Sequence, residues 1–445
     1  MAGRWRPGGR RAGSGRAESW AGRRAGRWVA LCALSALSAA ALTGCGGVPP
    51  PDDATGRDGQ AVQRLLDRRA AAIRERDADA FLATIDGSSA RYRAEQRRMF
   101  TNLAAVPLRS WTYHLVDTGG FTPSLGEGRR IAARVELRYR LSGYDTAPVV
   151  AEEYLTLARR DGRWYVASDD GEERGRRTSV QLWDQGAVTA VRGERSLVLG
   201  VGQDRRRLRE VAAGADRAVT ALRRVWPHAW AGRVVVQVPA SLDRMAALLG
   251  ASAGGYRGIA AVTTGEVGGG HGAAADRVIV NPEAYQILGD FGRRVVLTHE
   301  TAHVATRAAT TAATPLWLSE GFADWVGYLG TGRTPREVAP ELARSVEAGR
   351  LPNALPGDGA FNFGGKAESL SQAYEEGWLA CRLIAQKWGG EKLVEFYRAV
   401  GESSRRQGAV ESALRAVLGT SPDEFTALWR KYVASELGSA PSGGS

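Results

Sequence analysis

Two histidines and a glutamate in the stretch THETAHVATR, residues 298–307, have the spacing of a metal site. An α-helix has 3.6 residues per turn, so His299 and His303 lie on one face and can point their imidazoles at a common ion. Glu300 projects to the neighbouring side, where it can take a proton from a metal-activated water without being a ligand. The same spacing also occurs by chance on ordinary helices, so a metal site needs a third ligand.

The stretch TPLWLSEGFADWVGY, residues 314–328, offers that ligand. Thr314 is placed to cap a helix with Pro315 at its first position. Glu320 then falls two turns into the helix, and Asp324 follows one turn later on the same face. A second helix antiparallel to the first can bring Glu320 to the metal. Asp324 can then accept a hydrogen bond from the outer nitrogen of a ligating histidine, which fixes the tautomer of that ring.

Together the two stretches resemble the gluzincin metallopeptidases, in particular their peptidase MA-like branch, over about residues 187–437. The resemblance implies a peptidase with one Zn²⁺ per chain, held by three ligands: His299, His303 and Glu320. It also implies that Glu300 is the general base and that Asp324 orients a ligating histidine. The metzincin class is excluded, because Thr306 and Ala309 stand where that class has glycine and histidine.

Substrate-binding features of the relatives are only partly matched. No Gly-Ala-Met-Glu-Asn segment is present, by which aminopeptidase-N-type relatives bind a free amino terminus, and GIAAVTTGE stands in the comparable place. Glu266, in that stretch, is interpreted as a solvated loop acid. Tyr374, at the start of a predicted long helix, is the candidate donor to the oxyanion, with a packing role as the alternative. His271 is a second candidate for the oxyanion.

Residues 1–44 have the composition of an export signal. Eight arginines stand against one acid, and the apolar run at 28–43 is short for a membrane span and rich in Ala and Ser. The run ends in LTGC before a Pro/Gly linker, which resembles a bacterial lipobox. That resemblance implies that Cys45 is lipidated and anchors the chain to the outer face of the cytoplasmic membrane. A plain secretory signal is the alternative, and both Sec and twin-arginine export stay open.

The charge and the cysteines agree with an exported protein. Of the formal net charge of +12, the leader carries seven, and the remainder is spread along the chain. We therefore expect no nucleic-acid partner. Cys32 lies in the leader and Cys45 is the expected lipid site, which leaves Cys381 without a disulfide partner in the chain. Because Cys381 lies in an apolar helical run, we expect it to be a buried small hydrophobe.

The first domain is predicted to combine helices with an antiparallel sheet. Apolar residues recur at helical spacing from 62 to 73, and DADAFLATI predicts a second short helix. Strands follow at SWTYHLVD and RIAARVELRYRL, then a hairpin around Asp161-Gly162. Helices followed by such a meander resemble the nuclear-transport-factor-two-like (SnoaL-like) domains. The resemblance implies a cone-shaped fold that binds a small ligand, holds another domain or does no chemistry.

The second domain is predicted to begin with a small sheet and to end in helices. A hairpin at 187–201 and a helix over 205–225 come first. RVVVQVP, GIAAVTTG and DRVIVNP predict three further strands, with the helix SLDRMAALLG after the first of them. From residue 290 onward the pattern is almost entirely helical and closes with SPDEFTALWRKYV, a capped amphipathic helix. The fold class is therefore α+β, with a thermolysin-like zincin domain implied by the resemblance.

These patterns divide the chain into six parts. The divisions are a signal peptide (1–44), a linker (45–57), the nuclear-transport-factor-two-like domain (58–172), a polar linker (173–186), the gluzincin domain (187–437) and a disordered tail (438–445).

The function that these motifs favour is an extracytoplasmic, membrane-anchored zinc peptidase acting on peptides or proteins outside the cytoplasm. Its expected chemistry is hydrolysis by a zinc-activated water, with Glu300 as general base. The alternative is a non-catalytic, zinc-containing lipoprotein whose N-terminal domain binds a ligand or a protein partner. Intact Glu300 argues against it, because a decayed site would be free to lose the base. The sequence does not favour endopeptidase over exopeptidase action.

Overall fold

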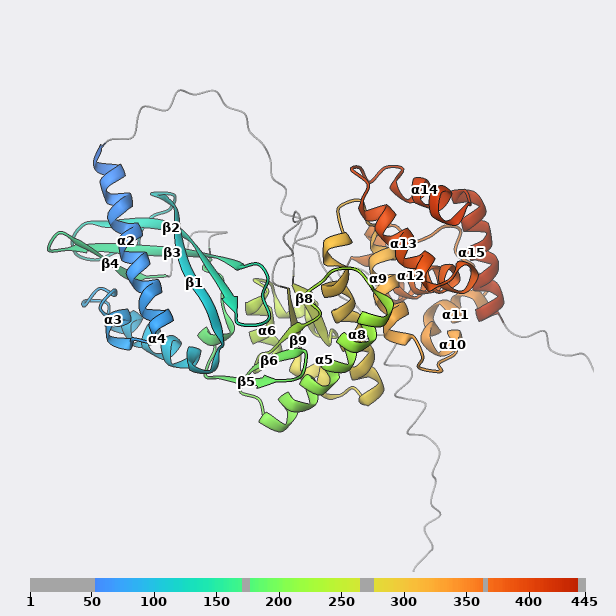
Figure 1. Ribbon diagram of the computed structural model, residues 1–445, viewed down its shortest axis with the longest axis horizontal. Coiled ribbons are helices and arrows are strands. Elements are labelled where there is room, and N and C mark those ends of the chain that lie inside the picture. Colours follow the sequence, from blue (N-terminus) through green and yellow to red (C-terminus); the bar gives the residue numbers. More distant parts are fainter. Residues whose placement is uncertain (1–52, 170–176, 265–275, 363–366, 439–445) are drawn as a thin grey trace, which may run out of the picture.

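The computed structural model describes residues 53–169, 177–264, 276–362 and 367–438 (Figure 1). They form an α+β structure, as predicted: helices with a four-stranded antiparallel sheet, then a five-stranded mixed sheet and a mostly helical half. None of the helices in these residues is long and apolar enough to cross a membrane. The predicted signal peptide and the lipid site Cys45 lie outside the described residues.

In the front part of the chain, a long helix, α2, packs against the sheet (Figure 1). The sheet has the order β1-β2-β3-β4, and all neighbouring strands are antiparallel. Asp161 (φ 48°) and Gly162 (φ 75°) form the turn between β3 and β4; a two-residue hairpin of this kind needs positive φ at both positions. The predicted hairpin is confirmed. The elements are α2 (Asp53–Glu75), α3 (Ala78–Leu82), α4 (Ala90–Asn102), β1 (Leu108–Thr118), β2 (Arg130–Leu141), β3 (Val149–Arg160) and β4 (Arg163–Ser168).

Helix α4 was not predicted from the sequence. Its buried residues are Tyr92, Gln96 and Met99, spaced as one helical face. The central one is polar, because Gln96 accepts a hydrogen bond from the buried guanidinium of Arg69 on α2. A glutamine in a core position weakens the apolar periodicity by which a helix is predicted.

The front sheet and the second sheet share one hydrophobic cluster. That cluster joins Leu65 of α2 and Trp111 of β1 to Leu197 and Leu199 of β6 in the second sheet. Trp183, in residues predicted to be a linker, is 2% exposed, and its ring centroid lies 5.5 Å from that of Trp111. Leu182 and Trp183 of the predicted linker thus pack into the core. The domain boundaries themselves stay predictions.

A buried ion pair also joins the two sheets. Arg277 of β9 donates from Nη1 and Nη2 to the two carboxylate oxygens of Asp145, at 2.8 and 2.7 Å. Asp145 follows β2 of the front sheet, and both residues are buried. A paired guanidinium and carboxylate of this geometry is more directional than apolar packing, so it fixes how the front sheet sits on the second.

The second sheet has the order β5-β6-β7-β9-β8. The β6–β7 and β7–β9 pairs are parallel, whereas β5 and β8 pair antiparallel at the two edges. The predicted strands and helices of this region are confirmed, and β8 forms the edge nearest to the helical half (Figure 1). The elements are β5 (Val188–Arg192), β6 (Ser196–Val201), α5 (Arg205–Val225), β7 (Val234–Val238), α6 (Leu242–Leu248), β8 (Ala261–Thr264) and β9 (Arg277–Val280).

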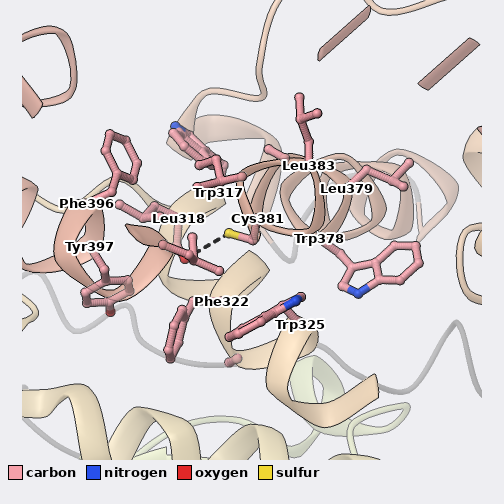
Figure 2. Close-up of a cluster of buried hydrophobic side chains, with 14 of the residues drawn as sticks. Trp317, Leu318, Phe322, Trp325, Trp378, Leu379, Cys381, Leu383, Phe396 and Tyr397 are labelled. Carbon is pink, nitrogen blue, oxygen red and sulfur yellow. Dashed lines mark hydrogen bonds between the residues drawn. The ribbon is translucent and has the colours of Figure 1, made fainter. Parts of the chain in front are cut away.

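The helical half is built on the close packing of α9 against α12 (Figure 2). A Cβ added at Gly377 of α12 would lie 2.6 Å from the carbonyl oxygen of Trp317 on α9, so this contact requires glycine. Cys381, one turn later, is fully buried with its Sγ 3.9 Å from the Leu318 carbonyl, which confirms the predicted small hydrophobe. The helices are α7 (Pro282–Gln286), α8 (Asp290–Thr306), α9 (Leu316–Tyr328), α10 (Pro335–Val338), α11 (Pro340–Glu347), α12 (Ala367–Trp388), α13 (Gly390–Gly401), α14 (Ala409–Ala413) and α15 (Pro422–Leu437).

Candidate metal centre

Helices α8 and α9 carry the predicted ligands and pack antiparallel. Glu320 lies opposite His299 and His303, whereas Gly327, two turns later, lies opposite Val295, nearer the start of α8. A Cβ at Gly327 would be 3.3 Å from the Val295 carbonyl oxygen, so glycine lets the two helices approach closely. The predicted antiparallel pair is confirmed.

The start of α9 differs from the prediction. The N-cap residue is Pro315 and the helix begins at Leu316, so the prediction that Thr314 caps it was wrong. The Thr314 hydroxyl instead accepts from the backbone N–H of Thr311 at 3.1 Å. Asp358, which lies far along the chain, accepts from the Leu316 N–H at 2.9 Å. A tertiary contact thus takes the place of the local cap.

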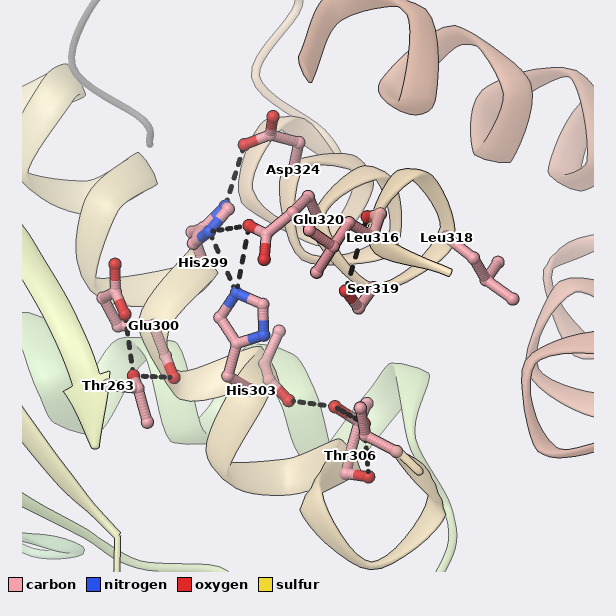
Figure 3. Close-up of polar contacts among 12 residues, drawn as sticks. Thr263, His299, Glu300, His303, Thr306, Leu316, Leu318, Ser319, Glu320 and Asp324 are labelled. Atoms are coloured by element: carbon pink, nitrogen blue, oxygen red, sulfur yellow. Dashed lines mark hydrogen bonds and ion pairs between the residues drawn. The ribbon is translucent and has the colours of Figure 1, made fainter. Parts of the chain in front are cut away.

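Three buried side chains converge between α8 and α9 (Figure 3). The Oε2 atom of Glu320 lies 3.3 Å from Nε2 of His299 and 3.5 Å from Nε2 of His303. The two Nε2 atoms are 3.0 Å apart. One ligand atom from each of the three residues falls within 4.8 Å of the others. This is a compact group that can hold a metal ion.

The chemistry of the group fits a cation. A neutral imidazole has one N–H and one acceptor nitrogen, and a carboxylate offers only acceptors. Oε2 of Glu320 is buried and forms no hydrogen bond in the described residues, although two imidazoles face it. A buried carboxylate oxygen without a donor is costly. A metal ion bound by all three side chains removes that cost, since each of them then donates a lone pair.

Electrostatics keep the Glu320 carboxylate ionised. Burial alone would raise the pKa of Glu320, but the imidazoles of His303 and His299 lower it to about 2. Asp324 shows the opposite balance, because burial raises its pKa to about 6 against the opposing effect of His299. The carboxylate nearest the point of convergence is therefore the better anion, as a metal ligand must be.

Asp324 orients one of the two histidines. Its Oδ1 lies 2.9 Å from Nδ1 of His299. Since a carboxylate accepts, Nδ1 of His299 carries the proton and Nε2 presents its lone pair to Glu320 and His303. The structure brings Asp324 to the place that the sequence predicted for it. Because the bond selects one tautomer, it prepares His299 as a ligand.

Glu300 lies beside this group and is hydrogen-bonded to a residue of the second sheet (Figure 3). The hydroxyl of Thr263, on β8, lies 2.7 Å from Oε2 of Glu300 and 3.0 Å from its carbonyl oxygen. Both residues are buried. Sequence reasoning missed Thr263, because VTT shows only a strand pattern and nothing in the sequence gives the strand's position relative to α8.

Tyr374 lies on α12, one turn before Gly377, and is buried. Its ring packs edge-on against that of Phe361, with centroids 5.1 Å apart. The packing role given above as the alternative for Tyr374 is thus observed. Its role as donor to the oxyanion stays a prediction. Glu266 and His271 lie outside the described residues.

Comparison with known proteins finds no match: no family model, no curated protein and no solved structure is similar to this chain. The fold and the site therefore define the class of protein. It is an α+β protein with a buried His-His-Glu group, of a kind that can hold a metal ion, between two antiparallel helices.

Proposed function

We propose that this protein is a zinc-dependent peptidase of the gluzincin type. The observation that carries the proposal is the convergence of His299, His303 and Glu320 in a buried site, with the Glu300 carboxylate alongside. Two imidazole nitrogens and one carboxylate are a donor set of catalytic zinc sites, which leave a fourth position open. A structural zinc site would be closed by a fourth protein ligand.

The residues have distinct roles in this mechanism. His299, His303 and Glu320 bind the ion, and Asp324 keeps the His299 ring in the tautomer that ligation needs. Zinc, when bound, lowers the pKa of a coordinated water to about 7 and polarises a carbonyl oxygen. Burial of the ligands excludes bulk water, which strengthens the electrostatic interactions inside the site.

Glu300 moves the proton. Its carboxylate takes a proton from the attacking water and returns it to the nitrogen of the leaving amine. It lies next to His299 on α8 but is not one of the three residues grouped as metal ligands. Its carboxylate can therefore act as a base. Tyr374 is our candidate to stabilise the oxyanion of the tetrahedral intermediate.

The proposed location is outside the cytoplasm. The leader and Cys45 support an exported chain, lipid-anchored to the outer face of the bacterial cytoplasmic membrane. Substrates are then peptides or proteins that reach that face. Nucleic acid is not a proposed partner.

The test is metal content together with turnover. The purified protein should contain about one zinc per chain and cleave members of a peptide library. Chelation should abolish cleavage, and added Zn²⁺ should restore it. Glu300→Gln should keep its zinc but lose about 10²–10⁴-fold in kcat, the usual worth of a general base.

Glu411→Gln is the matched control. Glu411 is an exposed residue of α14 that pairs with Arg415 one turn away, so the same chemical change there should leave kcat unaltered. If Glu300→Gln cleaves as fast as this control, Glu300 is not the general base. A zinc-loaded wild type that cleaves no peptide would instead support the non-catalytic alternative.

A further inference from the structure

The edge strand β8 contributes one side chain to the group around Glu300. Thr263 is 5% exposed, and its hydroxyl lies 2.7 Å from Oε2 of Glu300. The two residues are 37 positions apart in sequence. Strand β8 pairs antiparallel with β9 through the register Thr263↔Val278, so the hydrogen-bonded ladder fixes the place of Thr263.

The alternation of side chains along β8 directs this hydroxyl toward α8. Ala261 belongs to the apolar cluster that includes Val296 and Leu297 of α8. Val262 belongs to a different cluster, with Met245 and Ile279 on the other side of the sheet. Residues two apart in a strand share a face, so Thr263 faces α8 together with Ala261.

A packing role alone does not account for this threonine. A buried hydroxyl needs one acceptor, and the carbonyl oxygen of Glu300, at 3.0 Å, would suffice. The carboxylate oxygen is nearer, at 2.7 Å, and it is the stronger acceptor when ionised. The hydroxyl therefore favours the carboxylate and links the end of a flexible side chain to a rigid strand.

We propose that Thr263 is the positioning residue for Glu300; this rests on the proposed function, in which Glu300 moves the proton. The side chain of a glutamate has several rotatable bonds, and its carboxylate must hold one orientation for proton transfer. A displacement of about 1 Å at a reacting group can cost about 100-fold in rate. Thr263 holds Oε2, and with it the plane of the carboxylate, so that the general base keeps one orientation before substrate arrives.

Thr263→Val tests this role. Valine keeps the β-branched shape and removes the hydroxyl. The expected result is a fall in kcat of about 10–100-fold, with KM and the zinc content unchanged, because the ligands are three other residues. Thr263→Ser keeps the hydroxyl and should restore most of kcat. Equal losses in the valine and serine variants would overturn the proposal, because shape rather than the hydroxyl would then matter.

Thr264→Val is the matched control on the same strand. The hydroxyl of Thr264 accepts from the backbone N–H of Arg277 at 3.0 Å, and this neighbour faces away from α8. Its loss should leave kcat within about twofold of wild type, as expected where no reacting group moves. Zinc lost from Thr263→Val, with no loss from Thr264→Val, would overturn the proposal in favour of a structural role at the metal site.

Crystal structures of the variants test the positioning role of Thr263 separately from the proposed function. In crystals of the Thr263→Val protein the Glu300 carboxylate should be displaced or split between rotamers, whereas Thr263→Ser should keep the wild-type position. This result does not depend on turnover, so it holds even if the wild type cleaves nothing and the proposed function fails. An unmoved carboxylate in the valine variant would overturn the positioning role and leave the proposed function intact.

Discussion

Two of the buried polar clusters in the described residues are built in different ways. In the front part, Arg69 donates to Thr84 at 3.2 Å and to Gln96, and its guanidinium lies over the Phe81 ring at 4.2 Å. A donor thus meets two acceptors and an aromatic face. In the candidate metal centre, ring nitrogens of His299 and His303 and the carboxylate of Glu320 face one another.

The difference shows how to interpret a buried polar cluster. In the Arg69 cluster Nη1 and Nη2 pair with acceptors of the protein, although Nε has no hydrogen-bond partner among the described residues. Paired donors and acceptors of this kind can hold a fold together without any ligand. Two buried imidazoles and a carboxylate that converge on one point offer ligand atoms that a cation can bind. The Arg69 cluster is thus paired within the protein, whereas the cluster between α8 and α9 is of a kind that can hold a metal ion. Each prediction below tests one side of this contrast.

The largest effect on metal binding is expected from Asp324→Asn. The change keeps the shape of the side chain but replaces the carboxylate that accepts from Nδ1 of His299. Loss of such an orienting partner typically lowers metal affinity by about 10–100-fold, or about 1.4–2.7 kcal/mol. Competition against a zinc-binding dye would measure the change. An unaltered affinity would mean that the contact is only structural.

An effect of similar size, on stability, is expected from Arg69→Met, which removes the donor of the Arg69 cluster. Gln96 then loses its donor while still buried, so the free energy of unfolding should fall by about 2 kcal/mol. The zinc content should not change. Adding Gln96→Leu should recover most of the loss, because a polar pair replaced as a whole by apolar side chains is nearly neutral. Urea unfolding of the three proteins measures this. If the double variant is less stable than the single one, the cluster does not act as a unit.

The sequence predicted that His299, His303 and Glu320 come together, because local geometry determines most of this group. His299 and His303 share a face through helical spacing, and Glu320 and Asp324 do so in turn. A reversal of the chain between α8 and α9 is then enough to bring the two sets of side chains together. Thr263 could not be predicted, since its contact depends on the order and register of a sheet formed by distant segments.

The same reasoning explains the other differences. The Thr314 cap followed a local rule, and the distant Asp358 replaced it. Helix α4 was missed because the polar residue Gln96 occupies a core position, where it accepts a hydrogen bond from Arg69. In each case a tertiary contact overrode a local pattern. Elements with strong patterns of their own, such as α5 and the β3–β4 hairpin, were predicted correctly.

The smallest effect is a pH dependence in the front part. Glu153 of β3 is half-buried, and burial raises its pKa to about 8, with Arg69 opposing the shift and Asp169 and Asp184 adding to it. Its pKa in the unfolded chain is about 4.3. Between these values the native protein binds more protons than the unfolded chain, so the stability that Glu153 contributes at low pH is lost as pH rises through about 8.

Glu153→Gln should therefore flatten the stability of the protein between pH 5 and 8, by about 1 kcal/mol once solvent screening of the half-buried side chain is allowed for. Unfolding is best followed with a chelator present, because zinc affinity also varies with pH. Glu152→Gln is the matched control, as this neighbour is exposed on the other face of β3. A pH profile that responds equally to both substitutions would show that the pH dependence of stability does not arise from Glu153.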